Sequence, residues 1–154
     1  MCRVIDYKEA DLAIWKKPLT LESLKEIMKD TLCEHVGLEI TEIGDDFLKG
    51  TLPVDSRTQQ HMGIIHGGAS VVLAETLGSA LANFCSAPGT RIVGLDINAN
   101  HVRPGRPPLV TGIARPVHIG RTTVVVEINI TDTEGKLVCI SRLTAAVLED
   151  ENAS

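Results

Sequence analysis

The residues best suited to chemistry lie within residues 59–84, in the stretch QQHMGIIHGGASVVLAETLGSALANF. Its second half is apolar or small almost throughout, and Glu75 carries its only formal charge. A helix without a polar face is usually buried on every side, and burying an unpaired carboxylate is costly, so we expect Glu75 to have a function. Ahead of it, His66-Gly67-Gly68 would open the helix, where glycines let a ligand approach the backbone and the first N–H groups are unpaired.

These N–H groups, together with the positive end of the helix dipole, form a site for developing negative charge. A carboxylate about two turns further along the helix could act as a general base or as a nucleophile. Oxyanion donors and a buried carboxylate in this order are parts of an active site. The apolar surroundings are expected to raise the pKa of Glu75 and with it the basicity of its carboxylate.

The rest of the chain must position this helix. A first helix is expected to start at Thr20 as its N-cap, with Leu19 and Leu24 placed for a hydrophobic staple. Alternating apolar residues and turn residues predict strands over His35–Ile43, Phe47–Val54, Arg91–Arg103, Leu109–His118, Thr122–Thr131 and Lys136–Leu148. The economical arrangement is α+β, an antiparallel sheet wrapped around one long central helix. Its open edges predict a dimer or a higher assembly.

The strand over Arg91–Arg103 has apolar side chains at alternate positions, as a half-buried strand requires. The residues expected to face the helix are Val93, Leu95, Ile97 and Ala99. His101 and Arg103 continue this parity. They are therefore expected just past the core, on the side of the sheet that faces the helix.

Length and composition are those of a single domain. Of the 154 residues 44% are hydrophobic and only 3% aromatic, so the core must be aliphatic. We expect an N-terminal extension over residues 1–17, the domain over residues 18–150 and a short tail over residues 151–154. The net charge of -5 argues against nucleic acid as the main partner.

The cysteines and histidines show no spacing typical of a metal site. Cys2, Cys33, Cys85 and Cys139 are scattered without a CxxC pair and are expected to be reduced and mostly buried. We expect no metal and no cofactor. No secretory signal and no apolar run of membrane-spanning length is found, so the prediction is a cytoplasmic enzyme without a membrane partner.

The element order, with HGGASVVLAE opening the central helix, resembles the hotdog fold of acyl-CoA thioesterases. It is similar to the branch of the Arthrobacter-type 4-hydroxybenzoyl-CoA thioesterases and the phenylacetate-pathway thioesterases. Within it, the chain most closely resembles the 1,4-dihydroxy-2-naphthoyl-CoA hydrolases and the enterobactin-pathway proofreading thioesterase. The stretches that carry the resemblance are PVDSRTQQHMGIIHGGASVVLAETLGS, VGLDINANHVRP and SRLTAAVLE.

The resemblance implies roles for the matching positions. Glu75 would be the catalytic carboxylate, as nucleophile or as general base on water, and the Gly67 backbone N–H would be the oxyanion donor. Gln60 and His66 would orient the substrate carbonyl and the loop, and Ser79 would position the hydrolytic water. The family takes the carboxylate and the oxyanion donors from opposite subunits, which makes a homodimer the catalytic unit, with a tetramer formed from two dimers.

Each of these residues could also have a different role. Glu75 could be paired with an arginine of another strand, and His66 could bond the backbone at a turn without taking part in chemistry. Ser79 could be a small residue that eases the contact between helix and sheet. Gln59 competes with Gln60, and only the six-residue spacing to the histidine favours the latter.

His101 and Arg103 are the candidates for contacts to coenzyme A, through pantetheine or phosphate. Phosphate favours the bidentate fork of arginine. Arg106, Arg115 and Arg121 compete for the same role, and each could instead be a solvated surface charge.

Substrate binding would also involve the loop and the start of the helix. Gly68 would let the ligand approach, and His61 and Met62 are candidates for lining the acyl pocket. Close relatives often carry a proline or an aromatic residue after the glutamine, and this chain departs from them there. Because aromatic residues are few, specificity for an aryl group follows from the resemblance alone.

We therefore expect hydrolysis of an acyl-CoA thioester to the free acid and CoA. The substrate would be an aryl-CoA, such as 1,4-dihydroxy-2-naphthoyl-CoA in menaquinone biosynthesis or a benzoyl-type CoA, or a broad range of acyl groups. One alternative is the same reaction on a misacylated aryl carrier protein, as in proofreading. Another is a hotdog protein that binds acyl-CoA without hydrolysing it.

Overall fold

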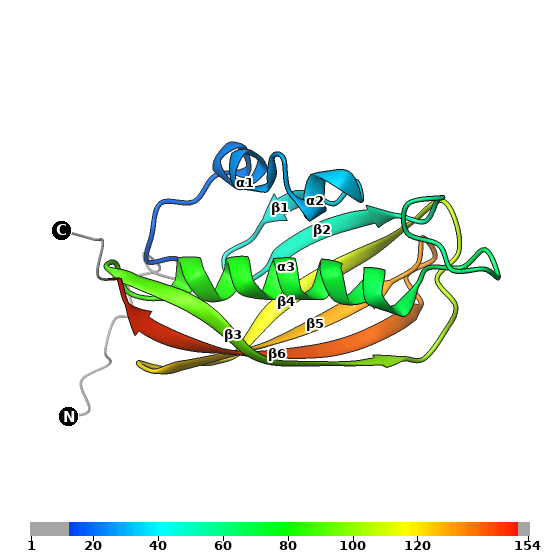
Figure 1. Cartoon of the computed structure of the whole chain (residues 1–154). Helices are drawn as coiled ribbons and strands as arrows, with labels where there is room; N and C mark the ends of the chain where they lie inside the picture. The colour runs from blue at the N-terminus through cyan, green and yellow to red at the C-terminus, as the bar shows by residue number, and fades with distance from the viewer. Residues whose placement is uncertain (1–12, 151–154) are drawn as a thin grey trace, which may run out of the picture.

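The structure, a computed structural model, describes residues 13–150. A six-stranded antiparallel sheet has the strand order β1-β2-β4-β5-β6-β3. The strands are Glu39–Ile43 (β1), Leu48–Pro53 (β2), Thr90–His101 (β3), Leu109–Ile119 (β4), Thr123–Thr131 (β5) and Leu137–Glu149 (β6). The long helix α3, Gly67–Cys85, lies along one face of the sheet, which curves around it (Figure 1). The predicted hotdog fold is thus confirmed.

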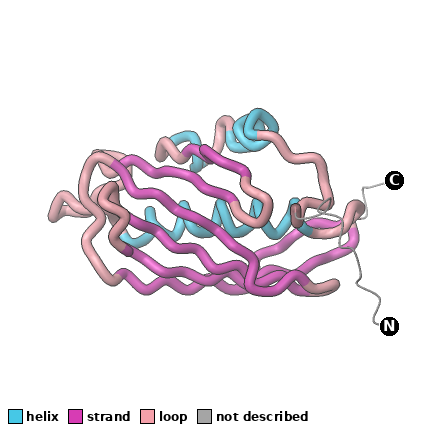
Figure 2. Tube along the Cα trace, turned by 180° about the vertical axis from the view of Figure 1, so that it is seen from behind, coloured by secondary structure: helices cyan, strands magenta, loops and turns pink. Residues whose placement is uncertain are grey.

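Strand β5 shows the predicted alternation most clearly. Its fully buried side chains are Val124, Val126, Ile128 and Ile130, and the residues between them are half-buried. The helix packs on this face: a Cβ on Gly78 of α3 would come within 2.8 Å of a Leu143 side-chain carbon. From behind, Figure 2 shows the strands as a continuous layer with α3 beyond them. Helix and sheet therefore share one aliphatic core.

Helix α3 is buried on one side only. Its fully buried apolar residues include Leu73, Ala74, Leu77, Leu81 and Ala82, whereas Glu75 is exposed. The prediction that the helix is buried all round is therefore wrong for a single chain, because no sheet covers its other face. The helix is also long and apolar enough to cross a membrane, contrary to our expectation, but its apolar face packs on the sheet as in a core helix.

Strand β3 differs from the predicted alternation. Its pairing with β6 shifts register over residues 94–96, which marks a β-bulge. Beyond the bulge Ile97 packs on the core as predicted, but ahead of it the inward residue is Ile92. The prediction that Val93 and Leu95 face the helix is wrong: both are exposed, because the extra residue reverses the parity of the strand.

The first helix begins where the sequence predicts. Helix α1, Leu21–Met28, follows Thr20, whose hydroxyl accepts a hydrogen bond from an N–H of the first turn in a capping box. The segment before it is tied to the domain, because the Trp15 Nε1 group donates to the Gly44 carbonyl at 2.8 Å. The remainder of the predicted extension, residues 1–12, lies outside the described residues.

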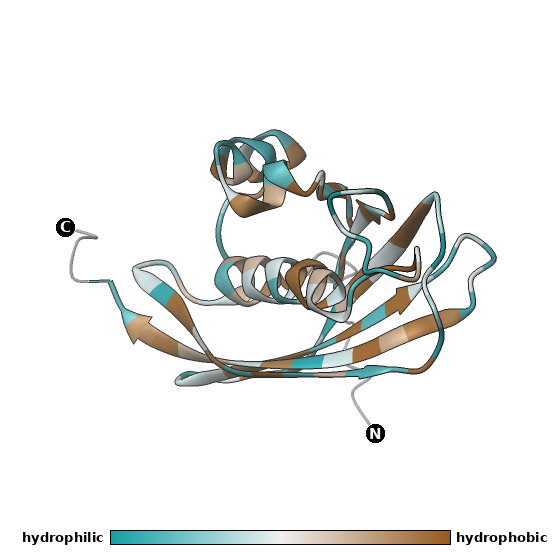
Figure 3. Cartoon of the chain, turned by 45° about the vertical axis from the view of Figure 1, so that its right-hand side comes forward, coloured by the Kyte–Doolittle hydropathy of each residue, from teal (hydrophilic) through white to brown (hydrophobic). Residues whose placement is uncertain are grey.

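The structure corrects the predicted start of the first strand. Residues 35–38, expected to begin a strand, belong to the short helix α2, Leu32–His35, and the turn that follows it. Gly37 ends this turn at a φ of 74°, a conformation that favours glycine, and strand pairing starts only at Glu39. Figure 3 shows α1 and α2 on the side of α3 that faces away from the sheet.

Candidate active site

The start of α3 is built around its N-cap, His66. The His66 Nδ1 accepts a hydrogen bond from the Gly68 N–H at 2.9 Å, and the His66 N–H donates to the Thr58 carbonyl at 2.8 Å. An accepting Nδ1 places the proton of a neutral imidazole on Nε2. His66 thus has the backbone-bonding role considered as its alternative. The Gly68 N–H is occupied, whereas the Gly67 N–H has no acceptor among residues 13–150.

A cleft of about 400 Å³ opens beside this amide, and we call it the Gly67 cleft. It lies between the loop that precedes α3, the start of α3 and the end of β3. The predicted site residues that line it are Gln60, Gly67, His101 and Arg103, and its remaining walls are Ile64, Ile65, Val102, Pro104, Gly105 and Val138. One chain therefore brings four predicted residues together.

The two candidate glutamines have different surroundings. The Gln59 side chain donates to the Val54 carbonyl at 3.3 Å and does not line the cleft. The Gln60 Oε1 accepts a hydrogen bond from the Met62 N–H, which orients the side chain. Its Nε2 group has no acceptor in the described chain and can donate into the cleft.

His101, the last residue of β3, lies directly against Gly67. Its Nε2 is 2.8 Å from the position that a Cβ on Gly67 would occupy. This contact agrees with the predicted position of His101 on the side of the sheet that faces the helix. The imidazole therefore forms the wall of the cleft next to the unoccupied N–H.

Glu75 lies outside this cleft. Its Oε1 is 3.6 Å from the Cβ position of Gly94 in β3. Glu75 follows Gly67 by eight residues, which corresponds to about 12 Å along the helix axis. Among residues 13–150 no cation lies within ion-pair distance of Glu75, so the alternative of an arginine-paired carboxylate is not met there. The expected desolvation of this side chain is absent from the single chain.

A second hollow, of about 480 Å³, opens one helical turn beyond Glu75, and we call it the Ser79 hollow. Its apolar wall consists of Leu24, Ile27, Met28, Ile40, Ala80, Phe84 and Ile92, and its polar lining residues are Thr31, Cys33, Thr76, Ser79, Asn83 and Arg91. Ile92 packs on α3 ahead of the bulge, as Gly94 does two residues later. The hollow and the Glu75 carboxylate therefore lie on the same side of α3.

Comparison with known proteins identifies the family. Residues 62–139 match the family described as the thioesterase superfamily. The chain belongs to this superfamily. A putative esterase of Vibrio cholerae is 54% identical over 136 residues, covering 88% of this chain and 91% of the relative. The 1,4-dihydroxy-2-naphthoyl-CoA hydrolase of Escherichia coli is 47% identical over 135 residues, covering 88% and 99% of the two chains.

The proofreading thioesterase EntH of Cronobacter turicensis is 46% identical over 135 residues, covering 88% of this thioesterase and 98% of the relative. A solved thioesterase structure from Haemophilus influenzae superposes with a TM-score of 0.87 at 46% identity, covering 90% of this chain and 97% of that one. The predicted recognition as a hotdog thioesterase and the enzyme class, a thioester hydrolase, are thus confirmed.

Two of the candidate arginines of this thioesterase lie together. The Arg103 guanidinium donates to the Leu137 carbonyl at 3.1 Å, which holds it at the mouth of the Gly67 cleft. Arg103, Arg106 and Lys136 line an adjoining hollow of about 370 Å³, which we call the Arg106 hollow. Its other residues are Pro104, Pro107, Asp132, Thr133 and Glu134. Sequence reasoning missed Lys136, although a lysine right after a turn, ahead of a strand, was a visible signal.

The other candidate arginines lie elsewhere. Arg115 forms an ion pair with Asp46 at 2.5 Å and stacks over the Phe47 ring at 4.7 Å, so it is already engaged. Arg121 lies in the turn after β4, whereas Arg106 lies in the loop before it. A strand of 11 residues separates them by about 35 Å, so the two cannot hold one phosphate within a single chain.

Two predicted substrate residues lie apart from both hollows. His61 and Met62 are exposed on the loop before α3 and line neither the Gly67 cleft nor the Ser79 hollow. Conversely, sequence reasoning missed Gly94, against which the Glu75 carboxylate lies. A glycine inside a strand often marks a bulge or a close approach, and that was the available signal.

The cysteines follow the prediction in part. Cys85 and Cys139 are buried, and burial raises the pKa of both thiols, which keeps them protonated. Cys33 is half-buried in the Ser79 hollow, and its Sγ lies 3.3 Å from the Thr76 hydroxyl. Cys2 lies outside the described residues. No group of three His, Cys, Asp or Glu side chains in the described range could hold a metal ion.

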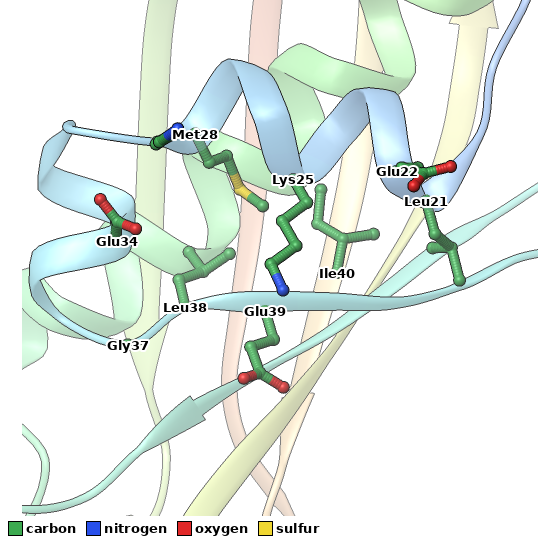
Figure 4. A pocket seen from close by; sticks show the side chains of 10 residues that line it. Leu21, Glu22, Lys25, Met28, Glu34, Gly37, Leu38, Glu39 and Ile40 are labelled. Atoms are coloured by element: carbon green, nitrogen blue, oxygen red, sulfur yellow. The ribbon is translucent and has the colours of Figure 1, made fainter.

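A further hollow, of about 540 Å³, lies between α1 and β1 (Figure 4). Its lining includes Lys25 and Met28 of α1 and Glu39 and Ile40 of β1. It contains none of the predicted site residues. The unoccupied Gly67 amide lies at the Gly67 cleft, and the Glu75 carboxylate adjoins the Ser79 hollow.

Proposed function

We propose that this thioesterase hydrolyses an acyl-CoA to the free acid and CoA at a site formed between two protomers. The observation that carries the proposal is the separation of two groups on one helix, the unoccupied Gly67 N–H and the exposed Glu75 carboxylate. A donor and a carboxylate that act on the two ends of one carbonyl must lie within about 7 Å, since each contact is about 3 Å and the C=O bond about 1.2 Å. The Glu75 carboxylate lies beside Gly94, whereas Gly67 contacts His101, about 20 Å further along β3, which is too far.

The edge of the sheet at β3 supports such a dimer. β3 ends the strand order, so its outer backbone groups are unpaired among residues 13–150, and Val93 and Leu95 are exposed along it. An edge of this kind is a template for pairing with another chain. In an antiparallel pair of β3 strands, the half that carries Gly94 lies alongside the half of the partner strand that ends at His101. Glu75 of one protomer, which lies beside Gly94, is thereby brought toward Gly67 of the other, which lies beside His101. A tetramer of two such dimers follows from the family resemblance.

In the proposed reaction the Gly67 N–H and the Gln60 Nε2 group donate to the thioester carbonyl oxygen. The positive end of α3 stabilises the charge that develops as the carbonyl carbon becomes tetrahedral. Glu75 of the other protomer either attacks this carbon or takes a proton from the water that attacks it. Ser79, one turn further on, holds that water. If Glu75 attacks, the C–S bond breaks to release CoA as its thiolate and leaves a mixed anhydride on Glu75, which that water then hydrolyses to the free acid. If Glu75 acts as the base, the tetrahedral intermediate breaks its C–S bond to give the free acid and the CoA thiolate, which takes up the proton held by Glu75.

The hollows support an assignment of the substrate's two ends. The largely apolar Ser79 hollow suits an uncharged acyl group, and about 480 Å³ lies within the range of small-molecule sites. The Arg106 hollow, where Arg103 and Arg106 lie beside the Lys136–Glu134 ion pair, is the end that we assign to the phosphates of CoA. Because the Escherichia coli relative is named for it, we propose 1,4-dihydroxy-2-naphthoyl-CoA or a benzoyl-type CoA as substrate, with a role in menaquinone biosynthesis in the cytoplasm.

The test is thiol release from these two aryl-CoA thioesters by wild type and Glu75→Ala. Turnover should fall at least about 100-fold, because the carboxylate does the acid–base or nucleophilic work. Glu26→Ala is the matched control, since Glu26 is an exposed carboxylate of α1 that lines none of the hollows. Near-normal turnover by Glu75→Ala would remove Glu75 from the mechanism.

A second candidate is the same hydrolysis on a misacylated carrier protein. The observation in its favour is the 46% identity to the relative named proofreading thioesterase EntH. The two candidates are separated by offering one acyl group both on CoA and on an aryl carrier protein. A much higher kcat/KM on the carrier would overturn the assignment of free acyl-CoA as the substrate.

A further inference from the structure

Gly67 is a glycine for reasons of space and not of backbone conformation. The glycines with positive φ are Gly37, Gly63, Gly89 and Gly135, and Gly67 is not one of them, so alanine could adopt its backbone angles. A Cβ at position 67 would lie 2.8, 3.3 and 3.4 Å from Nε2, Cε1 and Cδ2 of His101. Separations this short require one of the two groups to move. The edge of the imidazole therefore occupies the place of the missing side chain.

The amide of Gly67 is held from both sides. On one side the N-cap His66 is fixed by two hydrogen bonds, from its N–H to the Thr58 carbonyl and from the Gly68 N–H to its Nδ1. On the other side the His101 ring packs on the Gly67 Cα. The Gly67 N–H between these two contacts has no acceptor in the part of the chain that the structure describes, and Gly67 lines the Gly67 cleft.

The backbone that carries the His101 ring is held in place at the end of its strand. The Val102 and Arg103 N–H groups both donate to the Val138 carbonyl, at 2.8 and 3.2 Å, so the chain is anchored directly after His101. The imidazole makes no hydrogen bond or ion pair with any residue between 13 and 150. Its contact with Gly67 is therefore one of packing.

We propose that His101 is a positioning residue that fixes the Gly67 amide for the developing oxyanion, a role that rests on the proposed function of that amide. His101 lines the Gly67 cleft but not the Arg106 hollow, which we assign to the CoA phosphates. It therefore acts at the thioester end of the substrate and not on a CoA phosphate. Because the contact is steric, a residue of similar shape can replace it.

The first test measures kcat and KM on two thioesters of one acyl group, one with CoA and one with N-acetylcysteamine, which lacks the nucleotide and its phosphates. His101→Ala should lower kcat roughly 10- to 100-fold on both, since small displacements at a reacting centre have effects of that size. His101→Phe, which refills the space without a charge, should restore most of kcat. His35→Phe is the control at an exposed histidine of α2.

A rise in KM confined to the CoA thioester, with kcat unchanged, would make His101 a CoA ligand and overturn the proposal. Hydrolysis of neither thioester by the wild type would instead overturn the proposed function. Circular dichroism of each variant shows whether it is folded. If His101→Ala fails to fold, His101→Ser, which also removes the ring, serves in its place, with the same expected loss of kcat.

The second test is a double-mutant cycle between the two contacting residues. Gly67→Ala alone should lower kcat, because its Cβ and the imidazole cannot both keep their places beside the amide. In the His101→Ala background the same substitution should have a much smaller effect, because the space is vacant. Equal fold-changes in both backgrounds would show that the two residues are not coupled and would overturn the proposal.

Discussion

Two inactive variants should restore activity to each other if each site draws on two protomers. The first variant is Glu75→Ala, which keeps the amide. The second is Gly67→Val, which keeps the carboxylate but drives a side chain into the His101 ring at 2.8 Å. A mixed dimer then has one site with both defects and one site with neither.

The structure sets the expected magnitude. The Glu75 carboxylate lies beside Gly94, whereas Gly67 contacts His101, seven residues further along β3 and about 20 Å away along the strand. One chain therefore cannot supply both groups to one carbonyl. Random re-pairing of equal amounts makes half of the dimers mixed, and each of these has one intact site of two. The mixture should recover about a quarter of wild-type activity.

The assay is thiol release after the two variants are unfolded together in urea and refolded by dilution. Each variant refolded alone is the background, and wild type treated in the same way is the reference. Activity no higher than the sum of the two backgrounds would place both groups of a site on one chain. That result would refute the argument from the distance along β3.

Three further predictions concern other parts of the molecule. Leu95→Lys should separate the protomers and abolish activity without unfolding the chain, because Leu95 is 63% exposed; sedimentation and circular dichroism check this. Ile27→Glu should lower kcat/KM roughly tenfold for naphthoyl and octanoyl thioesters but not for acetyl-CoA, because it places a charge in the wall of the Ser79 hollow. Hydrogen bonds from Arg57 lower the pKa of Asp55 in the folded protein. The carboxylate therefore stabilises the fold above the ordinary pKa of aspartate, and this stabilisation is lost as the pH falls through the pKa of Asp55 in the folded protein. Urea midpoints should therefore differ between wild type and Asp55→Asn at pH 7 and converge in acid, once the pH is below the lowered pKa of Asp55.

Local features of the fold could be read from the sequence. The Thr20 cap depends on residues of its own helix turn, and the alternation in β5 depends only on the pleat of one strand. The β3 bulge could not be read in this way, because a shift of register is a property of two paired strands. The short α2 helix was missed for a different reason, since four helical residues leave too few positions for a period to show.

The same distinction between local features and contacts distant in sequence applies to the candidate site. The start of α3 at His66-Gly67-Gly68 follows from residue types next to each other in the chain, whereas the contact of Gly67 with His101 joins α3 to the far end of β3. The expectation that Glu75 is buried failed in the single chain, where the side chain is exposed. A pattern of apolar residues shows that a face is to be covered, but not which chain covers it.

The hydrogen bond from Trp15 to the Gly44 carbonyl gives the molecule an internal optical reporter. Trp15 is the only tryptophan, and it sits at the β1–β2 turn, on the edge of the sheet opposite β3. Its fluorescence should respond when the hairpin loosens but not when two β3 edges come apart. Loss of activity on dilution at constant emission would mean that protomers separate while each stays folded. A red shift at the same concentration would mean that a lone protomer cannot keep its fold.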